Sequence, residues 1–156
     1  MKRRPRDRYG RALRRGSTDE LLQAQEPEQV VDSAAQACQR AIELFDERRF
    51  FEAHEFFEYV WKADDIEAGD RRFWQGVTQV AVGCCHAQRG NIGGARTLLE
   101  RAAANLSHYP SPHQSIDTAA LICLTDNIAQ QIRRQGALPK LEFARFPPLT
   151  QESSLP

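Results

Sequence analysis

The stretch that decides the fold is residues 50–61, FFEAHEFFEYVW. On a helix, at about 100° per residue, His54, Glu58 and Trp61 fall within about 60° of arc, flanked by phenylalanines. His54 and Glu58 are four residues apart, so their side chains can meet on one face. Burying such groups costs several kcal/mol unless they are paired. We therefore expect this face to enter the core with His54 paired to Glu58.

The same helix phase makes a prediction about the other polar residues of the stretch. It directs Glu52 and Tyr59 toward solvent, and it places Glu55 at the edge of the buried face. Loss of the Glu58 carboxylate would leave a buried imidazole without its partner. We therefore expect removal of the Glu58 carboxylate to destabilise the domain far more than removal of the Glu52 carboxylate.

Apolar and small residues recur at helical spacing on both sides of this stretch. The pattern predicts five helices, over residues 27–48, 50–63, 71–89, 93–107 and 115–136. Asp70 is the expected N-cap of the third helix, and Ser115 is expected to open the fifth. Gly76 and Gly83 in the third helix would permit close packing against a neighbour.

A faint internal repeat appears at a shift of 42 residues, which aligns residues 45–50 with 87–92 and Phe57 with Leu99. Each unit reads as a helix, a tight turn and a second helix, similar to a tetratricopeptide hairpin. Two units fall short of the roughly three that a solenoid needs. The sequence therefore predicts an all-α, compact five-helix domain built from two tetratricopeptide-like hairpins plus a closing helix.

Charge and composition divide the chain into three parts. Residues 1–26 read as a basic arm, 27–136 as the helical domain, and 137–156 as a tail with four prolines and no clear period. Residues 1–15 carry eight basic residues and one acid, a net charge of +7 that is offset by the acidic remainder. Residues 2–15 could contact nucleic-acid phosphates, but the domain offers no basic face to extend that contact. A solvated arm, or one lying on its own acidic domain, fits the charge equally well.

Deleting residues 1–26 is expected to leave the helical signal and the melting temperature nearly unchanged, because no buried period is present there. Circular dichroism during a thermal scan of the full and shortened chains measures both quantities. A loss of several degrees would show that the arm is part of the fold.

Composition also indicates a location and excludes several classes of protein. No apolar run approaches the roughly 18 residues that span a bilayer, and no apolar segment of a secretory signal is visible, so we expect a cytoplasmic protein without membrane contact. The four cysteines lack Cys-x-x-Cys spacing and read as small buried thiols rather than zinc ligands. Neither a glycine-rich phosphate loop nor a nucleophile elbow is present.

A second polar stripe, formed by Gln75, Gln79 and His86, runs along the third predicted helix. If this helix packs on residues 50–63, the stripe could converge with His54 and Glu58. Two histidines and a glutamate would suffice for a divalent metal or for acid–base chemistry. The same residues also fit a polar pair that is satisfied within the core, or a binding pocket without chemistry. We take a polar pocket for a small ligand or partner segment as the leading hypothesis, with no cofactor assigned.

Three motifs in order carry a resemblance to a known family: FEAHE-x-x-E-x-x-W over residues 51–61, QG-x-x-Q-x-A over 75–81, and H-x-x-RGN-x-x-GA over 86–95. Together they resemble the small prokaryotic domain-of-unknown-function family catalogued as number 309. The resemblance implies an all-helical cytosolic domain and brings no established activity. It highlights seven candidate ligand-binding residues, which are His54, Glu55, Glu58, Trp61, Gln75, Gln79 and His86.

Overall fold

The computed structural model describes residues 27–135 and 141–150, in which α-helices are joined by short connections. The helices are α1 (Pro27–Val30), α2 (Ala34–Asp46), α3 (Phe50–Trp61), α4 (Arg71–Gln88), α5 (Ile92–Leu106) and α6 (Thr118–Gln135), with a 3₁₀ turn, η2 (Ala68–Asp70), before α4. The prediction of an all-α domain is confirmed. In these residues, no helix is both long and apolar enough to cross a membrane.

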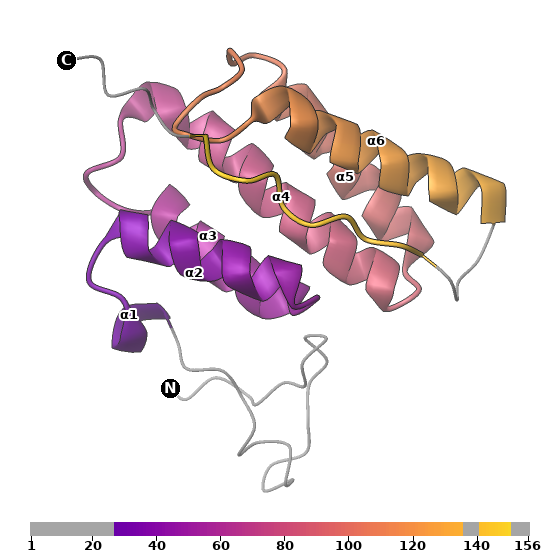
Figure 1. Cartoon of the computed structure of the whole chain (residues 1–156), viewed down its shortest axis with the longest axis horizontal. Coiled ribbons are helices and arrows are strands. Elements are labelled where there is room, and N and C mark those ends of the chain that lie inside the picture. Colours follow the sequence, from indigo (N-terminus) through magenta and orange to yellow (C-terminus); the bar gives the residue numbers. More distant parts are fainter. Residues whose placement is uncertain (1–26, 136–140, 151–156) are drawn as a thin grey trace, which may run out of the picture.

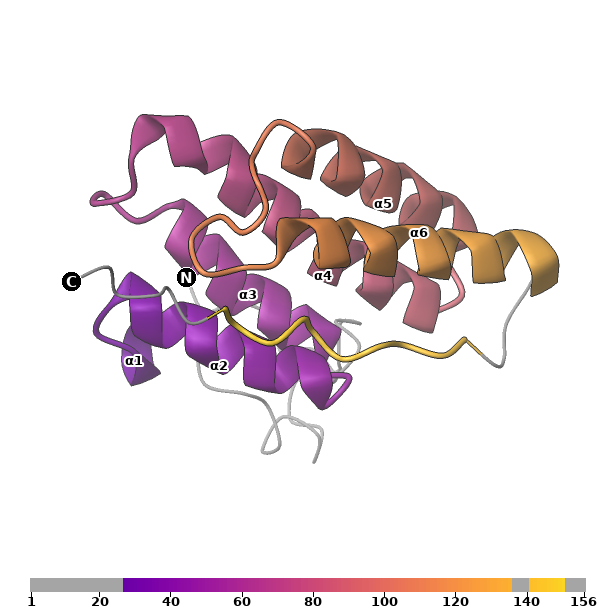
Figure 2. The same cartoon turned by 45° about the horizontal axis from the view of Figure 1, so that its top comes forward.

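Two helical hairpins, α2–α3 and α4–α5, form the body of the domain, and α6 closes it (Figures 1 and 2). Helix α4 packs against both α3 and α5, so it joins the hairpins, while α6 packs on α5. The two hairpin turns share a backbone conformation, because Arg48 and Gly90 both have positive φ, at 66° and 85°. These residues are 42 positions apart, as the internal repeat predicts.

The first predicted helix, 27–48, is in fact two helices, and this expectation is corrected. Ser33 has extended backbone and its Oγ accepts a hydrogen bond from the Gln36 N–H at 3.2 Å. The Gln36 side chain reaches back, and its Oε1 accepts from the Asp32 N–H at 2.8 Å. This reciprocal arrangement resembles a capping box, and it starts α2 afresh after the short α1.

One other expected helix start also differs. The closing helix begins at Thr118 rather than Ser115, and Asp117 Oδ1 accepts from the Ala120 N–H at 2.9 Å. Ser115 instead has a positive φ of 63°. Asp70 does precede α4, but its side chain makes no capping hydrogen bond.

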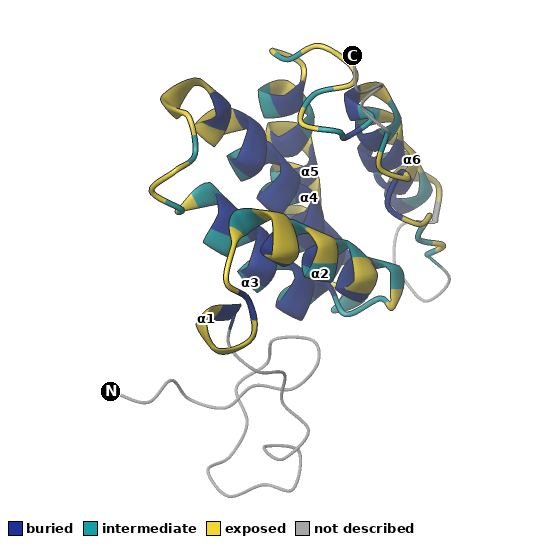
Figure 3. Cartoon of the chain, turned by 60° about the vertical axis from the view of Figure 1, so that its left-hand side comes forward, coloured by how far each residue is buried: buried dark blue, intermediate teal, exposed yellow. Residues whose placement is uncertain are grey.

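The core lies where the faces of the two hairpins and α6 meet, and the exposed residues gather on the outer faces, as on α2 in Figure 3. Phenylalanines dominate the α2–α3 part, with Phe45, Phe50 and Phe57 fully buried. Close contact between α4 and α5 depends on Gly83. A Cβ atom at that position would lie 2.8 Å from Cδ2 of the buried Leu99, so the glycine lets the two helices approach.

Residues 141–150 form an extended segment, here called the C-terminal strap, that runs between α2 and α6 (Figures 1 and 2). The Phe146 ring is buried, 5.4 Å from the ring of Phe45 and 5.6 Å from that of Phe57, measured between centroids. The Phe146 N–H donates to Asp46 Oδ1 at 2.7 Å. The strap thus completes the core of the first hairpin, although the tail shows no periodic sequence pattern.

Candidate functional site

His54 and Glu58 lie one turn apart on α3, at the edge of the core. His54 Nε2 is 3.6 Å from Glu58 Oε2, and the exposed fractions of the two side chains are 17% and 34%. His54 Nδ1 contacts the carbonyl oxygen of Phe51, and Glu58 also forms an ion pair with Lys62. The structure therefore brings the predicted pair together, but the expectation that the pair enters the core is wrong.

The helix phase explains this correction. The face of α3 that enters the core carries Phe50, Ala53, Phe57 and Val60, all essentially inaccessible to solvent. That face is turned by about one residue, roughly 100°, from the predicted one. Apolar side chains thereby fill the core, and the imidazole and carboxylate escape the cost of full desolvation.

The opposite correction applies to Glu52 and Tyr59, which were expected in solvent. Glu52 is only 7% exposed, and its Oε1 accepts from Nε and Nη2 of Arg49 at 2.9 and 2.7 Å. Tyr59 is half-buried and packs against the core. The structure therefore gives no basis for the expectation that loss of the Glu58 carboxylate destabilises the domain more than loss of the Glu52 carboxylate.

The second polar stripe lies on a half-buried side of α4, where Gln75, Gln79 and His86 are all partly exposed. Gln79 Oε1 accepts from Nδ2 of Asn105 on α5 at 2.8 Å. His86 contacts the turn between α4 and α5. These hydrogen bonds of Gln79 and His86 are thus made toward α5 and its preceding turn, not toward α3.

His86 is an acceptor in this turn. Its Nδ1 lies 3.1 Å from Arg89 Nη2 and 3.1 Å from Asn91 Nδ2. Arginine has only donors, so Nδ1 accepts and the proton of the neutral ring sits on Nε2. Burial, and to a lesser degree the charge of Arg89, lowers the pKa of His86. The imidazole is therefore neutral at physiological pH and suits a structural role in the turn.

The metal alternative would need His54, Glu58 and His86 to meet. Across residues 27–135 and 141–150, no group of three or more His, Cys, Asp and Glu side chains is placed to hold a metal ion. The geometry therefore gives no support to a metal site built from these three residues.

Two of the seven candidate residues, Glu55 and Glu58, line a groove of about 790 Å³ between the end of α3 and the α1–α2 junction. We call it the acidic groove, because its lining holds six carboxylates and a single ammonium group. Trp61 is half-buried beside it, with the Lys62 ammonium 5.8 Å from its ring centroid. The charged residues lining the groove are Glu28, Asp32, Glu55, Glu58, Lys62, Asp64 and Asp65.

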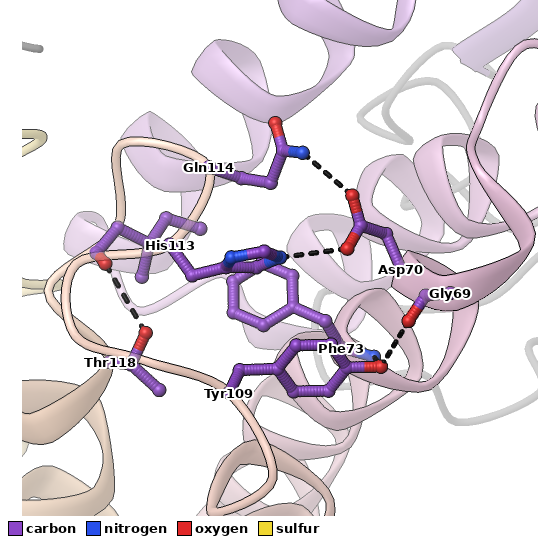
Figure 4. A network of polar contacts seen from close by, with 8 residues as sticks. Gly69, Asp70, Phe73, Tyr109, His113, Gln114 and Thr118 are labelled. Atoms are coloured by element: carbon purple, nitrogen blue, oxygen red, sulfur yellow. Dashed lines mark hydrogen bonds and ion pairs between the residues drawn. The ribbon is translucent and has the colours of Figure 1, made fainter.

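Sequence reasoning missed a second polar cluster, drawn in Figure 4. Asp70 is 8% exposed, and its two oxygens accept hydrogen bonds from His113 Nε2 and Gln114 Nε2, both at 2.7 Å. Tyr109 donates to the carbonyl oxygen of Gly69 at 2.5 Å. Asp70 resembled a helix cap in the sequence, and nothing there linked it to a loop more than 40 residues away.

The contacts of this cluster join two segments that are distant in the sequence. Both carboxylate oxygens of Asp70 are already engaged, and the His113 ring packs edge-on against Phe73 at 4.8 Å between centroids. The backbone of His113 also pairs with that of Ile116, with hydrogen bonds of 2.9 Å in both directions. The cluster therefore ties the loop before α6 to the start of α4.

Comparison with known proteins agrees with the motifs. Residues 38–98 match the model of a family described as a domain of unknown function, DUF309, which confirms the predicted resemblance over that segment. The chain is also similar to the uncharacterized protein YpuF of Bacillus subtilis (strain 168), with 31% identity over 98 residues. That alignment covers 62% of this chain and 56% of the relative, so this chain spans just over half the length of YpuF. No solved structure shows a significant match.

Proposed function

We propose that this protein is a non-catalytic binding protein whose acidic groove receives a basic segment of a partner protein. The observation that supports this most is the lining of the groove, six carboxylates around about 790 Å³ with Lys62 as their only cationic neighbour in the lining. Like charges gathered at one place repel each other, and a cationic partner relieves that repulsion.

The shape of the groove suits side chains with an apolar stem and a charged tip. Between the carboxylates, its walls are formed by small or apolar parts of Pro27, Ala34, Tyr59 and Ala63. Lysine and arginine lay their methylene chains along such surfaces and keep the charged head among polar groups. A basic peptide would therefore make apolar contacts with the walls through its methylene chains and ion pairs with the carboxylates through its charged groups.

The His54–Glu58 pair has a positioning role in this proposal. Glu58 lies between His54 on the core side and Lys62 toward solvent, so its carboxylate is held at the groove wall. An arriving lysine or arginine would replace Lys62 as the partner of Glu58, at small cost because Lys62 is 63% exposed. Exposed pairs of this kind contribute about 0.2–1 kcal/mol.

We also place the protein in the cytoplasm, with no partner in a membrane. The thiols of the described residues support this reading. Cys38, Cys84, Cys85 and Cys123 are unbridged, and burial raises the pKa of Cys38 to about 12 and that of Cys84 further. The Cys38 and Cys84 thiols are therefore unreactive, and thiols that form no disulfide suit a reducing compartment. The basic arm lies outside the described residues, so the nucleic-acid alternative stays a prediction.

Titration of a fluorescent Lys/Ala peptide into the protein tests the groove. Replacing Glu55 and Glu58 together with glutamine should weaken binding about tenfold, since each lost charge pair is worth up to about 1 kcal/mol. Affinity should also fall with added salt. Fluorescence anisotropy measures both effects.

The matched control is Glu100→Gln with Asp126→Asn, which removes the same charge from exposed positions on α5 and α6. This variant should bind the peptide as the unchanged protein does. Equal weakening in the two double variants would mean that net charge alone attracts the peptide, and the groove would lose its assignment.

A further inference from the structure

A second cavity, whose walls are largely separate from those of the acidic groove, is lined in part by Glu52, whose carboxylate has one oxygen with no hydrogen-bond partner among the described residues. Both nitrogens of the Arg49 fork, Nε and Nη2, bind Oε1 of Glu52, which leaves Oε2 buried and unpaired. A buried acceptor in this state bears its full desolvation penalty. Buried polar groups are nearly always satisfied, so an unpaired one at a cavity wall points to a missing partner.

The cavity has a size suited to a small molecule. It encloses about 530 Å³ between α1, α2 and α3, within the range of common ligand pockets. Leu44 and Phe56, both buried, supply an apolar floor, and Gln36 and Arg40 lie nearer its exposed side. An apolar floor and one unpaired buried polar atom are typical of a site that orients an amphipathic ligand.

The charges of the cavity favour a cation over an anion. The lining holds the carboxylates of Asp32, Glu43 and Glu52 against the guanidinium groups of Arg40 and Arg49. Each arginine already has a carboxylate partner, Arg40 with Glu43 at 2.9 Å and Arg49 with Glu52 at 2.7 Å. An anionic ligand would have to break one of these pairs and would meet Glu52 Oε2.

Burial also raises the pKa of Glu52, a shift that the neighbouring Arg49 partly offsets. A hydrogen bond from a second donor to Oε2 would offset the desolvation cost of the carboxylate, and a charged donor would offset it most. Among the residues that the structure describes, none supplies such a donor, and Arg49 directs both Nε and Nη2 to Oε1.

We propose that this cavity binds a small organic amine, whose ammonium group donates to Glu52 Oε2 while a short apolar body rests on Leu44 and Phe56. The site is distinct from the acidic groove, although Asp32 contributes to the lining of both. The ammonium group satisfies the unpaired oxygen, and the apolar body displaces water from the floor.

Phenethylamine is a suitable probe, and 2-phenylethanol is its neutral match in size and shape. A probe of this size at ordinary ligand efficiency binds with a Kd of about 1 mM, within reach of an NMR titration. The amine should shift the backbone amide signals of residues 36–44 and of Glu52 in the full chain. The alcohol should bind at least about tenfold more weakly, because it lacks the charge that pairs with the carboxylate.

Two variants separate this cavity from the groove. Glu52→Gln keeps the shape and should reduce amine affinity at least about tenfold, whereas Glu55→Gln with Glu58→Gln should leave it unchanged. If Glu52→Gln fails to fold, the shifted signals of the unchanged protein show which of the two sites binds the amine, because they map either to residues 36–44 and Glu52 or to the residues of the acidic groove. Equal binding of amine and alcohol, shifts confined to groove residues, or no binding at about 10 mM amine would each overturn the proposal.

Discussion

Replacing Phe146 with alanine is expected to lower the free energy of unfolding by about 3–5 kcal/mol. The Phe146 ring is 3% exposed and stacks near Phe57 at 5.6 Å, with Phe45 edge-on at 5.4 Å. Its removal would open a cavity that the surrounding helices cannot close without moving. Urea denaturation followed by circular dichroism measures the change in midpoint.

The matched control lies in the same strap. Leu149 is 45% exposed, so Leu149→Ala should change the free energy of unfolding by less than about 0.5 kcal/mol. If Phe146→Ala unfolds at the same urea concentration as Leu149→Ala, then the strap does not pack as described.

A second large effect is expected from Asp70→Ala, which should cost about 2–4 kcal/mol. The substitution removes the acceptor for both His113 Nε2 and Gln114 Nε2, leaving a partly buried imidazole and an exposed amide without it. Losing one partner of a buried network costs the desolvation of those that remain. Thermal and urea unfolding of the variant give the cost.

The control and the coupling test follow from the same geometry. Asp65→Ala removes an exposed carboxylate nearby and should be close to neutral. In a double-mutant cycle, Asp70→Ala and His113→Ala should be coupled by at least about 1 kcal/mol. Strict additivity of the two changes would show that the hydrogen bond between them contributes nothing.

Helical periodicity was sufficient to predict the helical class, the two hairpins and their turns. Arg48 and Gly90 adopt the same left-handed conformation at corresponding places, so the internal repeat reflects real structural equivalence. The phase of α3 was harder to predict, because Phe50, Phe51, Phe56 and Phe57 nearly encircle the helix. With apolar residues on several faces, periodicity alone does not select the buried one.

Other features depended on information that is not local. Ser33 and Gln36 form a capping pattern that would have divided the first predicted helix, and the signal was present in the sequence. The contact of Asp70 with His113 had no such signal, because it joins residues 43 positions apart. For the same reason, the convergence of Gln79 and His86 with His54 could not be tested until the helices were placed.

The C-terminal strap also bears on how the chain folds as it is synthesised. The hydrogen bond from Phe146 to Asp46 joins residues 100 positions apart, and the Phe45 and Phe57 rings against which Phe146 packs belong to the first hairpin. That hairpin emerges from the ribosome before the strap does, so its core lacks a ring until residues 141–150 follow. Long-range closure of this kind slows folding and leaves apolar surface exposed in the meantime. A segment made after all the described helices therefore completes the core of a hairpin made well before it.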